Sequence, residues 1–211
     1  MTRQSSFGVC ASCGTRKAKG GMVAHLRQCL ITQSKETGGP LSPILLLRAH
    51  TDGTSMFWLD LVATGEAKLK DVDRLLRRVW LECCGHLSEF YVPAHRKVSM
   101  NTKVGDAFSS IGSRLGYVYD FGSSTELIIS LSSVIAGNSG RSVQVVARNE
   151  PPTWPCNVCG QPAVVVCSQC EYEGTGFCCT EHEGEHDCGE EMLLPVVNSP
   201  RMGVCGYTGE A

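Results

Sequence analysis

Cysteine distribution constrains the possible folds more than any other feature of this sequence. The chain has 211 residues and 13 cysteines. Most of them lie near its two ends, in Cys-x-x-Cys pairs with histidines after them. Thiolates and imidazoles are the donors that zinc prefers in proteins. A disulfide framework is the alternative, but disulfides are typical of secreted chains, and residues 1–8 lack the apolar stretch of a secretion signal. We therefore expect both ends to be built around metal.

The first cluster joins the pair Cys10 and Cys13 to His25 and Cys29. His25 and Cys29 are one helical turn apart in a run of good helix formers, so they lie on one face of the expected helix. A tight turn, favoured by the glycine that follows Cys13, lets both sulfurs of the pair point at one ion. The sequence predicts a CCHC zinc finger within residues 1–35.

The second cluster, in residues 156–188, has more donors than one ion can use. Two zinc ions need eight ligands, and alternating ligand pairs cross-link a short chain that has little apolar core. We assign one ion to Cys156, Cys159, Cys179 and His182, and the other to Cys167, Cys170, His186 and Cys188. Cys178 stays open as the alternative to Cys179, as does the pairing of ligands between the ions. With the finger, about three zinc ions per chain are expected.

Charge differs sharply between the two ends. Residues 1–35 hold six Lys or Arg and no Asp or Glu, whereas residues 151–211 hold one Arg and nine acidic residues. A basic segment of this kind is typical of a surface that contacts nucleic-acid phosphates. We expect the contacts from the finger, through Arg16, Lys17, Lys19 and Arg27. The acidic end is a candidate surface for a protein partner.

Residues 36–150 have the pattern of an α+β domain. Strand-like runs occur at residues 44–50, 56–62, 87–92, 116–119, 127–132 and 142–148, and the first two flank a turn at residues 51–54. Apolar residues then recur at intervals of three and four from Leu69 to Trp80, which predicts an amphipathic helix that ends near Gly85. A short helix is expected in residues 104–112. The fold class is thus α+β, a mostly antiparallel sheet with one main amphipathic helix, flanked by zinc-stabilised modules at residues 1–35 and 151–211.

Two motifs of this middle region resemble a known family. The stretch Gly-His-Leu-Ser-Glu-Phe at residues 85–90 follows the predicted helix, and Gly-Tyr-Val-Tyr-Asp-Phe-Gly occupies residues 116–122. Both are similar to motifs of the plasmid pRiA ORF-three-like family, and residues 194–207 resemble the tail of its zinc-bearing members. The resemblance covers roughly residues 43–149 and implies an α+β fold often found near mobile elements, without an established reaction. The order of ligands in residues 156–188 resembles the cross-braced zinc modules of the MYND and HIT kind.

Acid–base and nucleophilic candidates are few. His86, Glu89 and Asp120 are the best acid–base candidates of the middle region, and Cys205 is a candidate nucleophile, a buried thiol or a substitute metal ligand. Cys83 and Cys84 are interpreted as core packing. The three predicted zinc sites each have four protein donors rich in thiolate, which is typical of structural sites.

The sequence therefore favours a non-catalytic zinc-binding protein that binds DNA or RNA, including messenger or ribosomal RNA, through its basic finger. The alternatives are a metal-supported enzyme that uses His86, Glu89 and Asp120, and a protein–protein adaptor. No apolar stretch approaches the roughly twenty residues of a membrane span, so we expect a cytoplasmic protein without a membrane partner.

Overall fold

A computed structural model describes residues 6–53, 56–92 and 96–209 of the chain. Its residues divide into two compact units. Unit 1 consists of Met1–Leu75, Ser88–Tyr119 and Glu126–Glu150. Unit 2 consists of three stretches that are far apart in sequence, Leu76–Leu87, Asp120–Thr125 and Pro151–Ala211.

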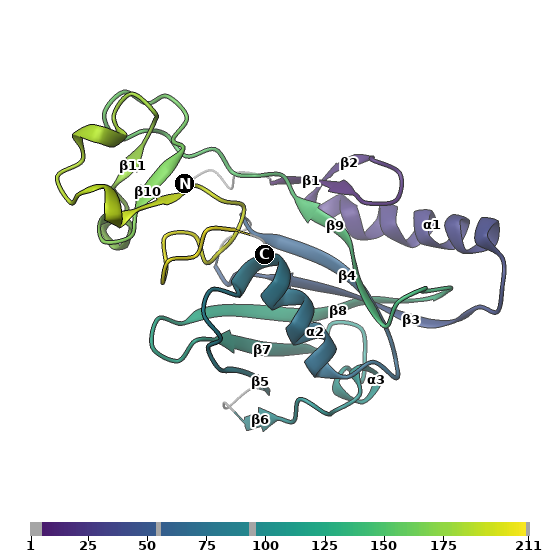
Figure 1. Cartoon of the computed structure of the whole chain (residues 1–211). Helices are drawn as coiled ribbons and strands as arrows, with labels where there is room; N and C mark the ends of the chain where they lie inside the picture. The colour runs from purple at the N-terminus through teal and green to yellow at the C-terminus, as the bar shows by residue number, and fades with distance from the viewer. Residues whose placement is uncertain (1–5, 54–55, 93–95, 210–211) are drawn as a thin grey trace. The chain divides into compact units, whose positions relative to one another are not determined.

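Unit 1 is built on a nine-stranded, mostly antiparallel sheet with the strand order β2-β1-β9-β4-β3-β8-β7-β5-β6 (Figure 1). Its strands are β1 (Phe7–Cys10), β2 (Arg16–Ala18), β3 (Ser42–His50), β4 (Trp58–Thr64), β5 (Ser88–Val92), β6 (Arg96–Val98), β7 (Arg114–Tyr119), β8 (Thr125–Gly137) and β9 (Val143–Asn149). The predicted strands all occur. β1 and β2, which lie in the predicted finger, extend the sheet because β1 is hydrogen-bonded to β9.

The longest helix is α1 (Lys19–Thr37), which contains the helix-forming run of the predicted finger. Its apolar face, formed by Met22, Leu26 and Leu30, is buried in the core of unit 1. The rest of this core comes from strands β1, β3, β4, β8 and β9, and includes Cys10, Ile44, Leu46, Trp58, Val62, Ile135, Val146 and Ala147. Apolar packing therefore holds α1 against the sheet.

A buried ion pair joins two central strands of this sheet. Arg48 on β3 is directly opposite Asp60 on β4, and its guanidinium donates to both carboxylate oxygens at 2.7 Å. Burial raises the pKa of Asp60, and the hydrogen bonds from Arg48 act in the opposite direction. Arg48 also donates to the carbonyl oxygen of Lys19 at 2.9 Å, which ties the first turn of α1 to the sheet.

The predicted amphipathic helix covers the whole apolar repeat but ends earlier than expected, at Leu81 rather than near Gly85. It consists of α2 (Leu69–Leu76) followed by a π-helical turn, η1 (Arg77–Leu81). It ends before Gly85 because the Gly85 N–H donates to the Glu82 carboxylate in a turn where Gly85 has a φ of 82°. The short helix α3 covers Val104–Ala107, which is only the start of the predicted segment.

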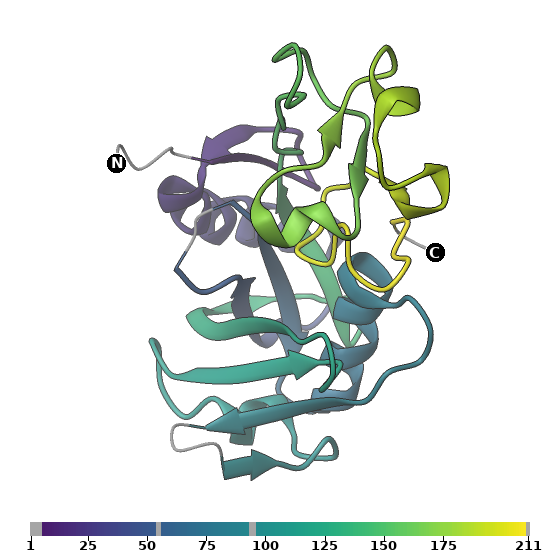
Figure 2. The ribbon, with the colours of Figure 1, turned by 90° about the vertical axis from the view of Figure 1, so that its left-hand side faces the viewer.

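Unit 2 has little regular structure. Its three-stranded antiparallel sheet has the order β11-β10-β12 (Figure 2). The elements are β10 (Val165–Cys167), η3 (Cys170–Glu173), β11 (Phe177–Cys178), η4 (Glu183–Glu185), η5 (Glu190–Met192) and β12 (Leu193–Pro195). A small apolar cluster forms around Val166, Phe177 and Met202, and the Trp154 ring stacks on Phe177 with centroids 4.8 Å apart.

The expected fold class is confirmed, since sheet predominates and Cys/His clusters occur towards both ends of the chain. The turn expected at residues 51–54 lies partly outside the described residues. Within the described part of the chain, every helix is too short or too polar to cross a membrane. The boundaries at residues 35 and 150 stay a prediction.

Candidate metal centres

Four clusters of metal-binding side chains occur among the described residues, and each has three cysteines and one histidine. Within every cluster the candidate ligand atoms lie within 4.8 Å of one another. The members are Cys10, Cys13, His25 and Cys29; Cys156, Cys159, Cys179 and His182; Cys167, Cys170, His186 and Cys188; and Cys83, Cys84, His86 and Cys205. We call them centres A, B, C and D in that order. Any of the four could hold a metal ion.

Centre A lies in unit 1, between the β1–β2 turn and α1. The turn is tight because the Gly14 N–H donates to the Cys10 carbonyl oxygen at 2.9 Å, and Gly14 has a φ of 70°. The sulfurs of Cys10 and Cys29 are 3.8 Å apart, and the Cys13 sulfur is 3.3 Å from Nε2 of His25. The turn and the helix thus supply two ligands each.

Centres B and C lie in unit 2 and use ligand pairs that alternate along the chain. In centre B the Cys179 sulfur is 3.6 Å from that of Cys159 and 3.2 Å from Nδ1 of His182. In centre C the Cys170 sulfur is 3.6 Å from both the Cys188 sulfur and Nε2 of His186. This alternation is the cross-brace expected from the sequence.

β11 and the glycine before it pass close to the ligands of centres B and C. The Cys178 side chain is buried, and its thiol lies 3.8 Å from the Gly176 carbonyl oxygen, outside the four clusters. Gly176 has a φ of 85°. A Cβ atom at this glycine would meet the Cβ atoms of Cys170 and Cys167 at 2.8 and 2.9 Å. The chain therefore needs a glycine immediately before β11, where its backbone passes the ligands of centre C.

Centre D, in unit 2, combines residues for which the sequence indicates separate roles. These roles are core packing for Cys83 and Cys84, acid–base chemistry for His86, and a nucleophile, a buried thiol or a substitute metal ligand for Cys205. The Cys84 sulfur is 3.0 Å from Nε2 of His86 and 3.6 Å from the Cys205 sulfur. Nε2 of His86 is 3.2 Å from Cys205, and the sulfurs of Cys83 and Cys84 are 3.7 Å apart. Cys84 and Cys205 are exposed. Core packing is thus the wrong interpretation of the Cys83–Cys84 pair.

The distances in all four clusters are short enough for one zinc ion to reach all four donors. Tetrahedral zinc bonds of about 2.3 Å to sulfur and about 2.0 Å to nitrogen place two sulfurs about 3.8 Å apart, and a sulfur and a nitrogen about 3.5 Å apart. The shorter sulfur–sulfur separations are 3.6–3.8 Å, far longer than the roughly 2.05 Å of a disulfide. The sulfur–nitrogen separations are 3.0–3.8 Å. The donor geometry suits a metal better than a disulfide framework.

Thiol acidity is uneven within the clusters. Hydrogen bonding with Thr15 lowers the pKa of Cys13 to about 6, whereas burial raises the pKa of Cys29 to about 12. In centre D the neighbouring Cys205 raises the pKa of Cys84 to about 12. Repulsion between adjacent thiolates opposes ionisation of all three thiols of a cluster, and a divalent cation removes that repulsion.

The four basic residues predicted to contact nucleic acid differ in their surroundings. Arg16 donates two hydrogen bonds to the Glu150 carboxylate, at 2.6 and 2.8 Å, and lies 3.9 Å above the Phe7 ring. Lys19 is half-buried, and burial lowers its pKa. Lys17 and Arg27 are exposed to solvent.

The acid–base candidates do not gather as a group. The Glu89 carboxylate pairs with Nζ of Lys97 at 2.8 Å. Asp120 instead accepts a hydrogen bond from Arg201 at 2.6 Å and lies 3.5 Å from Nε2 of His86. His86 and Asp120 thus meet at centre D, while Glu89 has a partner of its own.

Comparison with known proteins assigns neither a family nor a function. No protein-family model and no curated protein matches the sequence. A solved structure of a protein of unknown function from Methanosarcina mazei Go1 is similar, with a TM-score of 0.41 and 18% sequence identity. The match covers 50% of this chain and 67% of the other. The function must therefore be argued from the clusters themselves.

Proposed function

We propose that this is a non-catalytic zinc-binding protein whose basic surface around centre A binds nucleic acid. The observation that carries the zinc assignment is the donor set. Centres A, B and C each combine three cysteines and one histidine whose ligand atoms lie within 4.8 Å of one another. Such sets bind zinc as closed, four-coordinate sites.

A structural role for these ions follows from the ligand number. A catalytic zinc keeps a coordination position for water or substrate, whereas four protein donors fill the tetrahedron. Three thiolates also reduce the Lewis acidity of the ion. The ions of centres A, B and C would then hold turns and short strands in place rather than activate a substrate.

The nucleic-acid proposal is supported by the residues next to centre A. Lys17 on β2 and Arg27 on α1 are exposed, and residues 1–35 have no acidic side chain. Two exposed cations, one on a strand and one on a helix, can each contact a nucleic-acid phosphate. Arg16 contributes less because its guanidinium is already paired with Glu150.

The motifs that resemble the plasmid pRiA ORF-three-like family lie next to each other. Ser88 on β5 is opposite Tyr119 on β7, and the Asp120 N–H donates to the Leu87 carbonyl oxygen at 2.9 Å. We include membership of that family in the proposal because residues of its two motifs are hydrogen-bonded or paired with one another here.

The nucleic-acid proposal is tested by salt-dependent binding to random-sequence single-stranded RNA and duplex DNA. Each phosphate contact adds about one to the slope of log affinity against log salt. The double variant Lys17→Ala/Arg27→Ala should therefore lower the magnitude of this slope by about two. The matched control, Lys70→Ala/Arg74→Ala on α2, removes the same charge from exposed positions and should leave the slope unchanged.

A third variant, Glu150→Gln, releases Arg16 from its ion pair. The magnitude of the salt slope should then rise by about one. Zinc content should stay constant in all variants because none of these residues is a ligand. The assignment of this surface would be overturned if the slope fell equally in the test and control variants, or if the affinity did not depend on salt concentration. Preference for RNA or for duplex DNA then identifies the nucleic acid.

A further inference from the structure

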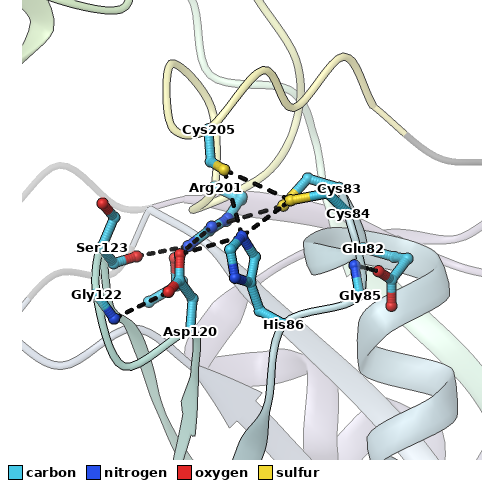
Figure 3. Close-up of polar contacts among 11 residues, drawn as sticks. Glu82, Cys83, Cys84, Gly85, His86, Asp120, Gly122, Ser123, Arg201 and Cys205 are labelled. Carbon is cyan, nitrogen blue, oxygen red and sulfur yellow. Dashed lines mark hydrogen bonds and ion pairs between the residues drawn. The ribbon is translucent and has the colours of Figure 1, made fainter.

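Centre D and the two charged residues beside it, Asp120 and Arg201, come from all three stretches of unit 2. Cys84 and His86 come from the first stretch, Asp120 from the second, and Arg201 and Cys205 from the third. Figure 3 shows Cys84, His86 and Cys205 pointing toward one another, with Arg201 beside Asp120. Stretches so far apart in sequence need a strong connection, because closing long loops costs conformational entropy.

The first stretch is shaped to present its ligands. Glu82 accepts hydrogen bonds from the Arg77 guanidinium at 2.6 Å and from the Gly85 N–H at 2.7 Å. With Gly85 at a φ of 82°, the chain turns sharply after η1. Cys84 and His86, on either side of this glycine, are thereby brought to 3.0 Å, sulfur to nitrogen.

Backbone strain occurs in centre D and beside it. Among the described residues, Asp120 and Cys205 are the only non-glycine residues with positive φ, at 65° and 51°. Aspartate tolerates this conformation, but cysteine seldom adopts it. Such strain persists where the surrounding structure enforces it and is common at functional sites. At Cys205 it turns the thiol toward His86, 3.2 Å away.

Arg201 contacts a residue of centre D and the neighbouring Asp120 through hydrogen bonds. Its side chain has no exposed surface, so its charge needs anionic partners within the fold. One is Asp120, at 2.6 Å. The guanidinium also donates to the Ser123 carbonyl oxygen at 2.6 Å and to the Thr125 hydroxyl at 3.2 Å, and it lies 3.5 Å from the Cys83 sulfur. Ligand thiolates are commonly held by such outer hydrogen bonds. A metal-bound Cys83 thiolate would accept this hydrogen bond from Arg201.

The overall cysteine pattern favours the same assignment. Centre D has the same donor set as centres A, B and C, three cysteines and one histidine. The four centres use every cysteine of the chain except Cys178. Two sulfur–sulfur distances at centre D, 3.6 and 3.7 Å, are also close to those of the other three centres.

We propose that Cys83, Cys84, His86 and Cys205 bind a fourth zinc ion, with Arg201 and Asp120 as its outer support, and that this ion joins the first and third stretches of unit 2, with the second stretch held beside it by Asp120. The proposal goes beyond the structural role given to centres A, B and C. It is also independent of nucleic-acid binding.

Metal counting on the full-length protein, by native mass spectrometry in the presence of a reductant, tests this site. The wild-type chain should carry four zinc ions, one for each cluster. Cys205→Ser should lose one ion and keep three. The matched control is Cys178→Ser, since Cys178 lies outside the clusters, and this variant should keep all four. Three ions in the wild-type chain, or no loss in Cys205→Ser, would overturn the proposal while leaving centres A, B and C intact.

A second measurement needs no variant and so does not depend on how Cys205→Ser folds. Zinc-loaded wild-type protein is treated with N-ethylmaleimide, and the alkylated cysteines are identified by peptide mapping. Cys84 and Cys205 are exposed, so as free thiols they would react at once. Bound to zinc, they should react as slowly as Cys170 and Cys188 and become reactive when a chelator is added. Immediate alkylation, or a Cys84–Cys205 disulfide in the zinc-loaded protein, would overturn the fourth site.

Discussion

Among the described residues, one apolar cluster of unit 1 buries eleven side chains, whereas that of unit 2 buries three. The Cys/His clusters show the opposite distribution, with centre A in unit 1 and centres B, C and D in unit 2. A long helix and a nine-stranded sheet can exclude water from a large interior, but short strands and turns cannot. We therefore expect metal cross-links to stabilise unit 2, whereas apolar packing stabilises unit 1.

Centre A shows that the two means of stabilisation overlap in unit 1. Its ligand Cys10 belongs to the apolar core together with Met22 and Leu26 of α1. β1 is also hydrogen-bonded to β9, and Gly8 allows β1 to pass close to the Trp58 ring, where a Cβ atom would collide. Metal at centre A would add to a structure that packing already holds.

Removal of zinc should produce the largest difference between the units. Structural zinc contributes about 10–16 kcal/mol in small zinc domains, so a strong chelator at neutral pH should unfold unit 2. Hydrogen exchange followed by mass spectrometry should show rapid exchange across β10–β12. Strands β3, β4 and β8 should stay protected because their core is almost wholly apolar, with Cys10 inside it and Cys29 packed against it as its metal ligands. If β3 and β4 lost protection at the same chelator concentration, the contrast between the units would fail.

Truncation of a core side chain should produce the next largest effect, confined to unit 1. Leu26 is fully buried, so Leu26→Ala should lower the free energy of unfolding of unit 1 by about 2–5 kcal/mol. Urea titration followed by hydrogen exchange in β3 and β4 measures this change. Gln28→Ala, at an exposed position of the same helix, should change it by less than about 0.5 kcal/mol. Zinc content should stay constant in both variants, and loss of zinc without loss of stability would contradict the prediction.

A glycine substitution beside centre C should produce the smallest effect, confined to unit 2. At position 176 a Cβ atom would press on Cys167 and Cys170 at a φ of 85°, a strain of about 1–3 kcal/mol. Zinc affinity of one site, measured by chelator competition, should fall by roughly 5- to 150-fold in Gly176→Ala, since 1.4 kcal/mol is tenfold. Gly184→Ala, where a Cβ atom meets nothing within 4 Å, should match the wild type. Equal affinities would show that β11 does not position these ligands.

Local patterns account for most of what the sequence predicted. Apolar runs on either side of a turn placed β3 and β4, and a repeat at intervals of three and four placed α2, because each element orders its own apolar side chains. β1, β2 and β6 had no such signal, since short strands are defined by the neighbour to which they pair. The end of α2 was placed too late, because Glu82 and Gly85 form a turn that the apolar repeat does not encode.

By itself, the sequence determined the close ligand pairs of centres A, B and C, because two ligands within a few residues of each other fall near one another once a turn or helix forms. It left open how the pairs of centres B and C combine, and whether Cys178 or Cys179 is a ligand, because 16 to 20 residues separate the pairs that meet. Only the tertiary structure decided that Cys84 and His86 meet Cys205, since 121 and 119 residues separate the partners. The same holds for the buried pair of Arg201 and Asp120, 81 residues apart. Such encounters depend on how distant stretches pack, and the sequence alone indicated separate roles for the three cysteines and the histidine of centre D.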